Sequence, residues 1–356
     1  MYGFMVMRCV LKHHVCLCVL STAVLAGLAL ITAQTKVYAG SLNCDGIVNT
    51  YGTGVPGNPS GDNPNKRIEC DGDGRYEGEY GKGNGGRAVI TIVDELKITD
   101  NGKRNTNPAI QVERQGKLTL AGEVSIQNVN KGILVKDSKS SVIVTQGKIG
   151  VRGDYVIGVK DGGTVTLMGE VKVNSVGIVF MGDKGTANVS GGAGGATISL
   201  ANGNSTGVIM QGKGGANATV INMTITGSGG VGAEMMGEGT LMLNMVKISQ
   251  VQMGARVSKG KLTVMGGEIK ANGAGGIGAD VSGGVLEVMG NVTIMGTTMG
   301  LRVAGTGSAT MVGGKIQGGG SGGYGVIVES SGNVTLSGGV EISGFKMGGL
   351  CEGGDV

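Results

Sequence analysis

The sequence contains few of the residues that usually build large cores and active sites. Its 356 residues include no Trp, three Phe, seven Tyr and four Pro, and 16% of them are charged. Only two histidines occur, His13 and His14, and both lie near the start. If that segment is removed, Ser-His-Asp and Cys-His catalysis and imidazole-ligated metal sites are excluded. We therefore expect no catalytic, cofactor-binding or metal-binding residues.

The abundant residues indicate a thin core built from small repeated units. Gly contributes 75 residues, about a fifth of the chain, against a usual share of ~7%. The sequence has no Gly-x-y triplet period, which excludes collagen. Hydrophobic residues make up 40% of the chain, so it can bury a core and is not simply disordered.

Residues 1–39 are typical of a cleaved signal peptide. Arg8 and Lys12 precede an apolar run, Val15–Ile31, and a small-x-small cleavage pattern follows at Val37–Ala39. The alternative is a single transmembrane anchor, but the apolar run of about 17 residues is shorter than the ~20 that span a bilayer. We expect export to the periplasm, the cell surface or the medium.

Cleavage at this point would leave a nearly neutral chain. Residues 1–39 contain three basic residues and no acid, so 27 of the 30 basic residues remain against 26 acidic ones. This balance gives no electrostatic reason to bind nucleic acid, and we expect no such partner.

Three cysteines remain after cleavage, Cys44, Cys70 and Cys351. Exported proteins meet an oxidising compartment, so we expect a Cys44–Cys70 disulfide that closes a loop of about 27 residues within the loop-like segment 40–85. In the loop-entropy model such a bridge stabilises the fold by roughly 3 kcal/mol. The alternative pairs one of the two with Cys351, which is otherwise an odd thiol.

Segment 86–356 repeats itself with a period near 23 residues. The motif Gly-x-apolar-x-apolar starts at Gly116, Gly163, Gly239, Gly260, Gly284 and Gly332, with degenerate copies at Ser140, Gly185, Ala216 and Gly307. A fixed period of this length indicates one supersecondary unit stacked many times. The longest spacing, between Gly185 and Ala216, is expected to hold a looped-out corner at Gly191–Gly195.

Each unit contains two further runs in which apolar residues alternate. The second run includes Val124-x-Ile126, Ile149-x-Val151, Val171-x-Val173, Ile198-x-Leu200, Val246-x-Ile248, Val292-x-Ile294 and Val340-x-Ile342. The third includes Ile133-x-Val135, Ile178-x-Phe180, Val208-x-Met210, Ala255-x-Val257, Ala279-x-Val281, Leu301-x-Val303 and Val326-x-Val328. Three strands per unit, separated by Gly- and Asn-rich corners, predict an all-β fold, a parallel β-helix of about eleven coils.

The alternation also predicts which side chains face outward. The first strands should present Thr119, Ile143, Thr166, Asn188, Thr219, Met242, Thr263, Glu287, Thr310 and Thr335. The second strands should present Ser125, Gly150, Lys172, Ser199, Lys247, Lys270, Thr293, Gln317 and Glu341, and each should open with a charge that alternates in sign, as in Glu123, Lys148 and Glu170. Neither row holds an acid pair on adjacent coils, which argues against glycan cleavage.

Two other groups of residues have a structural and a functional interpretation. Acids follow the third strands as turn residues, or alternatively as a cation-binding corner: Asp137, Asp161, Asp183 and Glu238. Methionines are interpreted as core filling, or alternatively as an apolar binding surface: Met235, Met236, Met242 and Met245 are examples.

The leader and the repeats resemble a known family. Arg8–Thr22 and Gln34–Ala39 resemble the leader of one group of Gram-negative autotransporters, and the cysteine pair with its Gly-rich three-strand repeat resembles a pertactin-like passenger domain. This resemblance covers most of the chain and implies a right-handed β-helix, surface display and a virulence-associated role. It also implies a C-terminal translocator barrel in the outer membrane, which the sequence up to Val356 does not contain. We therefore expect a truncated gene product, a fragment, or a secreted solenoid with a missing or separate translocator.

Two function classes follow. The leading hypothesis is a non-enzymatic exported β-helix of the adhesin type, with host cell-surface or matrix glycoproteins as partners. The alternative is a polysaccharide-active β-helix, a lyase or glycoside hydrolase, whose carboxylates the expected register misplaces.

Overall fold

The computed structural model describes residues 68–71, 89–92, 96–99 and 108–352, apart from 174, 229, 274 and 321. These residues belong to one compact unit, Leu42–Val356. The predicted signal peptide and Cys44 lie outside the described residues. Within the segment expected to be loop-like, residues 68–71 form a strand that pairs with residues 110–113.

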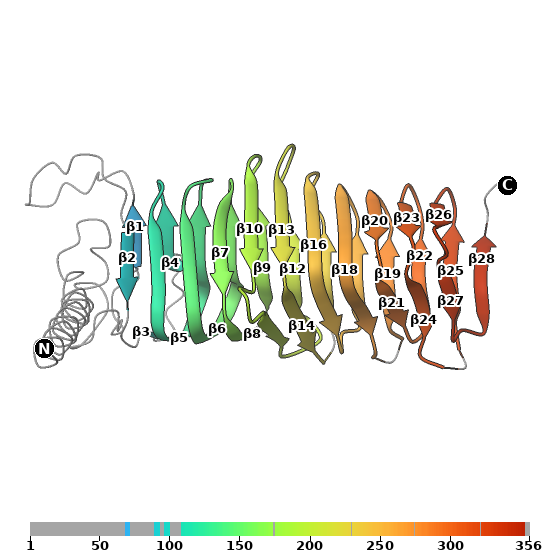
Figure 1. Cartoon of the computed structure of the whole chain (residues 1–356), viewed down its shortest axis with the longest axis horizontal. Helices are drawn as coiled ribbons and strands as arrows, with labels where there is room; N and C mark the ends of the chain where they lie inside the picture. Colours follow the sequence, from blue (N-terminus) through green and yellow to red (C-terminus); the bar gives the residue numbers. More distant parts are fainter. Residues whose placement is uncertain are drawn as a thin grey trace, which may run out of the picture. The chain divides into compact units, whose positions relative to one another are not determined.

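The described residues form parallel strands joined by short connections. Figure 1 shows the strands following one another in chain order from β1 to β28. A strand pairs with strands of the preceding and following turns, as β17 (Met253–Val257) pairs with β15 (Val231–Met235) and β19 (Ile277–Val281). The architecture is an all-β solenoid of about ten turns, and the predicted fold class is confirmed.

Three columns of strands form three faces, which we call the first, second and third face. The first face consists of β2 (Val89–Ile92), the starts of β5 (Lys117–Lys136) and β6 (Ser141–Lys160), β7 (Gly163–Leu167), β10 (Thr186–Ser190), β13 (Asn217–Ile221), the starts of β16 (Thr240–Ser249) and β18 (Lys261–Ala271), β20 (Val285–Met289), β23 (Ser308–Val312) and β26 (Asn333–Ser337).

The second face continues each turn. It consists of β3 (Leu96–Thr99), the middles of β5 and β6, β8 (Gly169–Val173), β11 (Ala196–Leu200), β14 (Met223–Gly227), the ends of β16 and β18, β21 (Thr293–Gly296), β24 (Lys315–Gly318) and β27 (Glu341–Ser343).

The third face completes it. Besides β15, β17 and β19, it contains β1 (Ile68–Asp71), β4 (Pro108–Glu113), the ends of β5 and β6, β9 (Val176–Met181), β12 (Thr206–Met210), β22 (Met299–Val303), β25 (Tyr324–Glu329) and β28 (Met347–Glu352).

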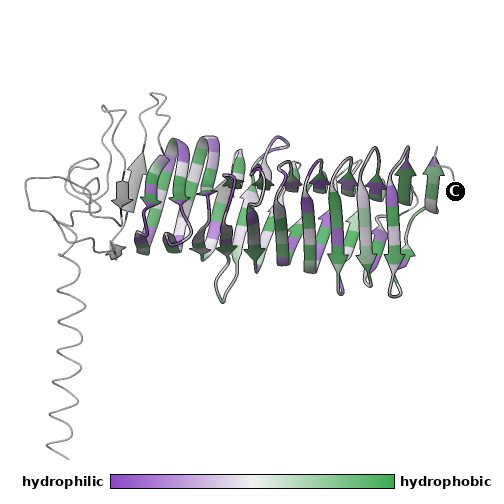
Figure 2. Ribbon diagram, turned by 90° about the horizontal axis from the view of Figure 1, so that it is seen from above, coloured by the Kyte–Doolittle hydropathy of each residue, from purple (hydrophilic) through white to green (hydrophobic). Residues whose placement is uncertain are grey.

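The core consists of inward aliphatic side chains stacked from turn to turn. On the third face the stack reads Ile110, Ile133, Ile157, Ile178, Val208, Ala233, Ala255, Ala279, Leu301 and Val326, and all of them are buried. This is the register that the third alternating run predicts. Figure 2 shows the resulting alternation of hydrophobic and hydrophilic residues along the strands. Each buried Val, Leu or Ile side chain stabilises the fold by about 1.5–3 kcal/mol.

A stack of glycines lies beside this core, at the second position of successive third-face strands. Gly254 shows why no other residue fits. A Cβ atom there would lie 2.2 Å from Ile269 Cγ2 and 2.4 Å from the carbonyl oxygen of Gly278, the next glycine of the stack. Gly207, Gly232, Gly278, Gly300 and Gly325 have equivalent surroundings. The stack therefore lets the third face approach the isoleucines of the second face.

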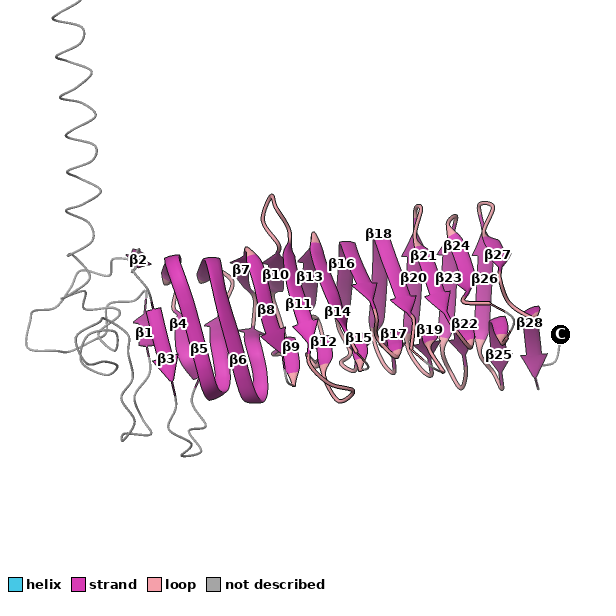
Figure 3. Ribbon diagram, turned by 90° about the horizontal axis from the view of Figure 1, so that it is seen from below, coloured by secondary structure: helices cyan, strands magenta, loops and turns pink. Residues whose placement is uncertain are grey.

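The longest repeat spacing is accommodated by connections. Gly191–Gly195 forms a turn between β10 and β11, so the predicted looped-out corner is confirmed. A second long connection, 201–205, lies between β11 and β12. Figure 3 shows the described part of the chain as strands and connections, with no helix.

A candidate binding notch on the third face

The outward side chains of the third face form one continuous row, which we call the third-face row. Each member lies between the two inward residues of its strand, and the pairing registers place consecutive members beside each other. The row reads Gln111, Leu134, Gly158, Val179, Ile209, Glu234, Arg256, Asp280, Arg302 and Ile327. It is thus apolar from Leu134 to Ile209 and charged from Glu234 to Arg302.

The apolar part of the row forms a small outer core around Tyr155. Leu134, Val179 and Ile209 pack with Tyr155, and all four are buried. Gly158 makes room for the ring, since a Cβ atom there would lie 2.7 Å from Tyr155 Cε2. Burial, with a smaller contribution from the neighbouring Asp154 carboxylate, raises the pKa of the Tyr155 hydroxyl above its usual range. The outward side chains in this part of the third face are therefore covered by one another.

The charged part of the row is a ladder of ion pairs. Arg256 Nη1 lies 3.2 Å from Glu234 Oε1. Arg302 bridges two turns, with Nη1 2.9 Å from Asp280 Oδ1 and Nη2 2.6 Å from Glu329 Oε2. The hydrogen bonds that Arg302 donates to Glu329, with a smaller contribution from the one to Asp280, raise the pKa of its guanidinium, although desolvation opposes this shift. Each of these carboxylates thus has a guanidinium partner.

A notch lies where the apolar and charged parts of the row meet. The connections 201–205 before β12 and 272–276 before β19 are longer than 228–230 before β15 and 250–252 before β17. The described residues of the two longer connections therefore form walls on either side of the two shorter ones, three turns or about 14 Å apart. The cavity between them has a volume of about 410 Å³.

Hydrogen bonds hold both walls in place. In the first wall, the side-chain oxygen of Asn202 accepts the N–H of Asn204 at 3.0 Å and the hydroxyl of Ser205 at 3.1 Å. In the second, the Thr297 hydroxyl accepts the N–H of Gly276 at 2.8 Å and donates to the carbonyl of Gly273 at 2.6 Å. The notch is consequently formed before any ligand arrives.

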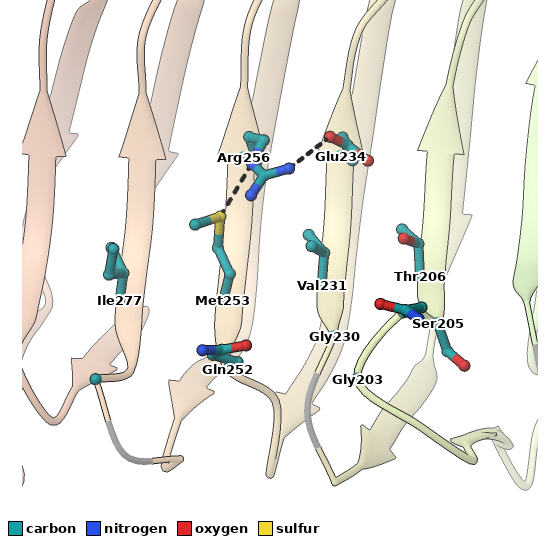
Figure 4. Close-up of a pocket in the computed structure, with 12 residues that line it drawn as sticks. Gly203, Ser205, Thr206, Gly230, Val231, Glu234, Gln252, Met253, Arg256 and Ile277 are labelled. Carbon is teal, nitrogen blue, oxygen red and sulfur yellow. Dashed lines mark hydrogen bonds and ion pairs between the residues drawn. The ribbon is translucent and has the colours of Figure 1, made fainter.

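The floor of the notch combines apolar and polar groups. Val231, Met253 and Ile277 project from three successive strands, as Figure 4 shows. Above them lies the Glu234–Arg256 ion pair, whose arginine also places Nε 3.2 Å from the sulfur of Met253. The two charged residues that line the notch therefore carry opposite signs.

One nearly buried residue of the notch has a hydroxyl group without a partner among the described residues. Thr206 is only 8% exposed and lines the cavity. Its hydroxyl has no hydrogen-bond partner among the residues that the structure describes. A buried hydroxyl without a partner costs about 1–3 kcal/mol. Sequence reasoning missed this site because it examined the outward residues of the first and second strands only; the unequal connection lengths before the third strands were the available signal.

The predicted outward row of the first face is correct except at one step. Thr119, Ile143 and Thr166 are neighbours, as expected. Asn188 was expected beside Thr166, but it pairs with Thr164, and Ser190 takes the place beside Thr166. From Asn188 onward the row again follows the prediction: Thr219, Met242, Thr263, Glu287, Thr310 and Thr335. The Thr row is therefore two offset segments, not one continuous surface.

The predicted row of the second face is wrong at more positions. Ser125 was expected beside Gly150, but it pairs with Lys148. Ser199 was expected in one row with Lys247, but it pairs with Thr226, which in turn pairs with Ser249. Lys247 belongs to the adjacent row. The expected stacking of Glu123 on Lys148 is also wrong, because Glu123 pairs with Gln146. The observed rows are Lys172, Ser199, Thr226 and Ser249, and, beside it, Lys247, Glu268, Thr293, Lys315 and Glu341.

Charges alternate in sign in the row from Lys247 to Glu341, not at the strand-opening positions where the alternation was expected. Lys315 Nζ lies 2.9 Å from Glu341 Oε2 on the next turn. Glu268 is bound by Lys270 on its own strand, at 2.6 Å. On the first face Glu287 is bound by Lys261, at 2.7 Å.

Two of the four acids that follow the third strands, Asp137 and Asp161, act in turns, as the structural interpretation predicted. The Asp137 carboxylate accepts hydrogen bonds from the N–H groups of Arg114, Lys139 and Ser140. Asp161 accepts the N–H of Asp183 at 3.2 Å. The carboxylates thus link the corners of successive turns. No group of three or more His, Cys, Asp or Glu residues arranged to hold a metal ion occurs in the described ranges.

The methionine interpretation is correct only in part. Met235 is fully buried in the core, but Met236 and Met245 are 44% and 64% exposed, and Met242 lies in the outward row of the first face. Met265 and Met289 are also exposed. Core filling therefore explains Met235 but not the exposed methionines, Met236, Met245, Met265 and Met289.

The cysteine prediction stays open, since Cys44 lies outside the described residues. Cys351 is a free, exposed thiol on β28. It pairs in register with Val328, so it occupies an inward position of the third face.

Comparison with known proteins does not assign the chain to a family. In the part of the chain that the structure describes, no helix has the length and apolar character needed to cross a membrane. No protein-family model, curated protein or solved structure matches the sequence.

Proposed function

We propose that the chain is a non-enzymatic binding protein of the exported, adhesin type, related to the pertactin-like autotransporter passengers. In this proposal residues 1–39 direct export, the solenoid is a rigid scaffold at the cell surface or in the medium, and its third face meets host cell-surface or matrix glycoproteins.

The preformed notch of the third face is the observation that carries the proposal. Its walls are fixed by hydrogen bonds, and ligand pockets are commonly preformed hollows of 300–1,000 Å³. The acids of the third face support binding over glycan cleavage, because Glu234, Asp280 and Glu329 each form an ion pair with an arginine. General acid–base catalysis needs carboxyl groups that are free to exchange protons with the substrate.

Binding of the purified full chain to immobilised matrix glycoproteins and to cultured cells tests the proposal. The first variant carries Gln252→Ala and Arg256→Ala on the third face, and the matched control carries Thr310→Ala and Thr335→Ala on the first face. We expect the third-face variant to lose binding and the control to keep it. No binding above a scrambled-loop protein, or equal loss in both variants, would refute the proposal, as would release of reducing sugar from a glycan panel.

A further inference from the structure

We propose that the third-face notch binds a neutral saccharide unit, and this rests on the proposed binding function. The occupant must satisfy a buried hydroxyl, a charge-balanced ion pair and an apolar floor at the same time. Each of these features restricts the chemistry of the ligand.

The charges of the notch select against ions. Its charged lining residues are Glu234 and Arg256, and these neutralise each other at 3.2 Å. An anion near Arg256 would meet the Glu234 carboxylate, and a cation would meet the guanidinium. An uncharged ligand avoids both repulsions and still finds strong hydrogen-bonding groups in the pair.

The hydrogen-bonding groups of the notch match hydroxyls. The Thr206 hydroxyl is buried and has no partner among the described residues, so it can donate to the ligand or accept from it. The Gln252 side chain is exposed in the cavity and offers both an amide donor and a carbonyl acceptor. The Arg256 guanidinium supplies donors and the Glu234 carboxylate supplies acceptors. A sugar hydroxyl donates and accepts, so it can pair with any of these groups.

The floor and the walls of the notch favour a saccharide over a peptide. Val231, Met253 and Ile277 provide an apolar surface for the C–H face of a sugar ring. A peptide strand would need free backbone groups, but β15 and β17 already pair with strands on both sides. The walls also close the notch within about 14 Å along the solenoid axis, which suits one or two sugar residues.

Titration of the full chain with neutral oligosaccharides tests this inference. The probes are glucose-, galactose-, mannose- and N-acetylglucosamine-terminated tetrasaccharides, with a sialylated saccharide and an uncharged peptide as comparisons. We expect a neutral saccharide to bind, and Thr206→Val to weaken it about three- to ten-fold, which corresponds to one hydrogen bond. Thr310→Val on the first face is the matched control and should leave the affinity unchanged.

Unfolding of the same variants separates a ligand-binding role of the hydroxyl from a structural one. We expect Thr206→Val to unfold at the same or a higher urea concentration than the wild-type protein, because its hydroxyl has no partner among the described residues. A lower midpoint would show that the hydroxyl stabilises the fold, and would overturn the assignment. Equal affinity of the Thr206 and Thr310 variants, preference for the sialylated saccharide, or binding of the peptide alone would also overturn it.

The proposed function and the saccharide site fail in different ways. If cells and glycoproteins bind the full chain with equal strength before and after Thr206→Val, and neutral saccharides do not compete, the saccharide site is refuted and the adhesin proposal stands. If the parent chain binds neither cells nor glycoproteins but does bind a neutral saccharide, the adhesin proposal is refuted and the site stands.

Discussion

Replacing Gly254 by alanine should destabilise the solenoid strongly, although it adds a single methyl group. The new Cβ would lie 2.2 Å from Ile269 Cγ2 and 2.4 Å from the carbonyl oxygen of Gly278. A side chain can rotate away, but the carbonyl belongs to the backbone of the next turn and can move only with it. Overpacking a well-filled core costs typically 1–3 kcal/mol. We expect about 3 kcal/mol, near the upper end, because a backbone contact must open.

Gly194→Ala is the matched control for this prediction. Gly194 lies in the Gly191–Gly195 turn, where a Cβ atom would meet nothing within 4 Å. The same substitution should there be neutral or stabilise the protein by about 0.4–1 kcal/mol, because alanine restricts the unfolded chain. Urea unfolding followed by circular dichroism measures both variants, and hydrogen exchange locates the loosened turns. If the two variants unfold within 0.5 kcal/mol of each other, as a rough limit for an uninformative substitution, the close approach of the glycine stack has no energetic consequence.

Three further predictions concern the third face and the cysteines. Burial raises the pKa of the Tyr155 hydroxyl above its value in the unfolded chain, so its contribution to stability is present below pH about 10 and is lost as the pH rises through the folded pKa. Tyr155→Phe should remove this loss of stability at alkaline pH, which urea unfolding between about pH 8 and 12 measures. An unchanged dependence of stability on pH would contradict the burial argument. Arg302→Met should lower stability by about 1 kcal/mol, since two partly exposed carboxylates lose their common partner, and the loss should shrink in high salt; a loss that does not depend on salt would point to packing instead. Iodoacetamide should label Cys351 in the native protein but label Cys44 and Cys70 only after reduction, and peptide mapping that finds either of the latter alkylated in the native state would exclude their disulfide.

The third-face register could be predicted from the sequence because the core specifies it. Shifting the third alternating run by one residue would turn every inward aliphatic side chain outward, so the run from Ile133 to Val326 has one acceptable alignment. The outward rows are less well specified. A shift by two residues keeps the same side chains inside, and burial does not distinguish the pairing of Asn188 with Thr164 from a pairing with Thr166.

The unequal connection lengths before the third strands were a signal for the notch, but its lining could not be predicted, because that depends on how the connections lie relative to each other in space. Thr206 has the pattern of an ordinary strand residue, and nothing in the sequence around it indicates that it is nearly buried and lines a cavity. The exposure of Met245 was missed for a related reason: methionine suits both core and surface, and composition alone does not separate the two.

The glycine stack has a genetic consequence. Met253-Gly254-Ala255 and Ile277-Gly278-Ala279 occupy equivalent places on consecutive turns, and each glycine meets only the turn beside it. Gain or loss of one whole turn of coding sequence would join equivalent surfaces and recreate the same contacts, since solenoid stability is a sum over neighbouring turns. Gain or loss of a few codons inside a strand would instead place a side chain where only glycine fits. Variation in the length of this gene should therefore occur in multiples of one turn, and shorter insertions should be confined to the corners.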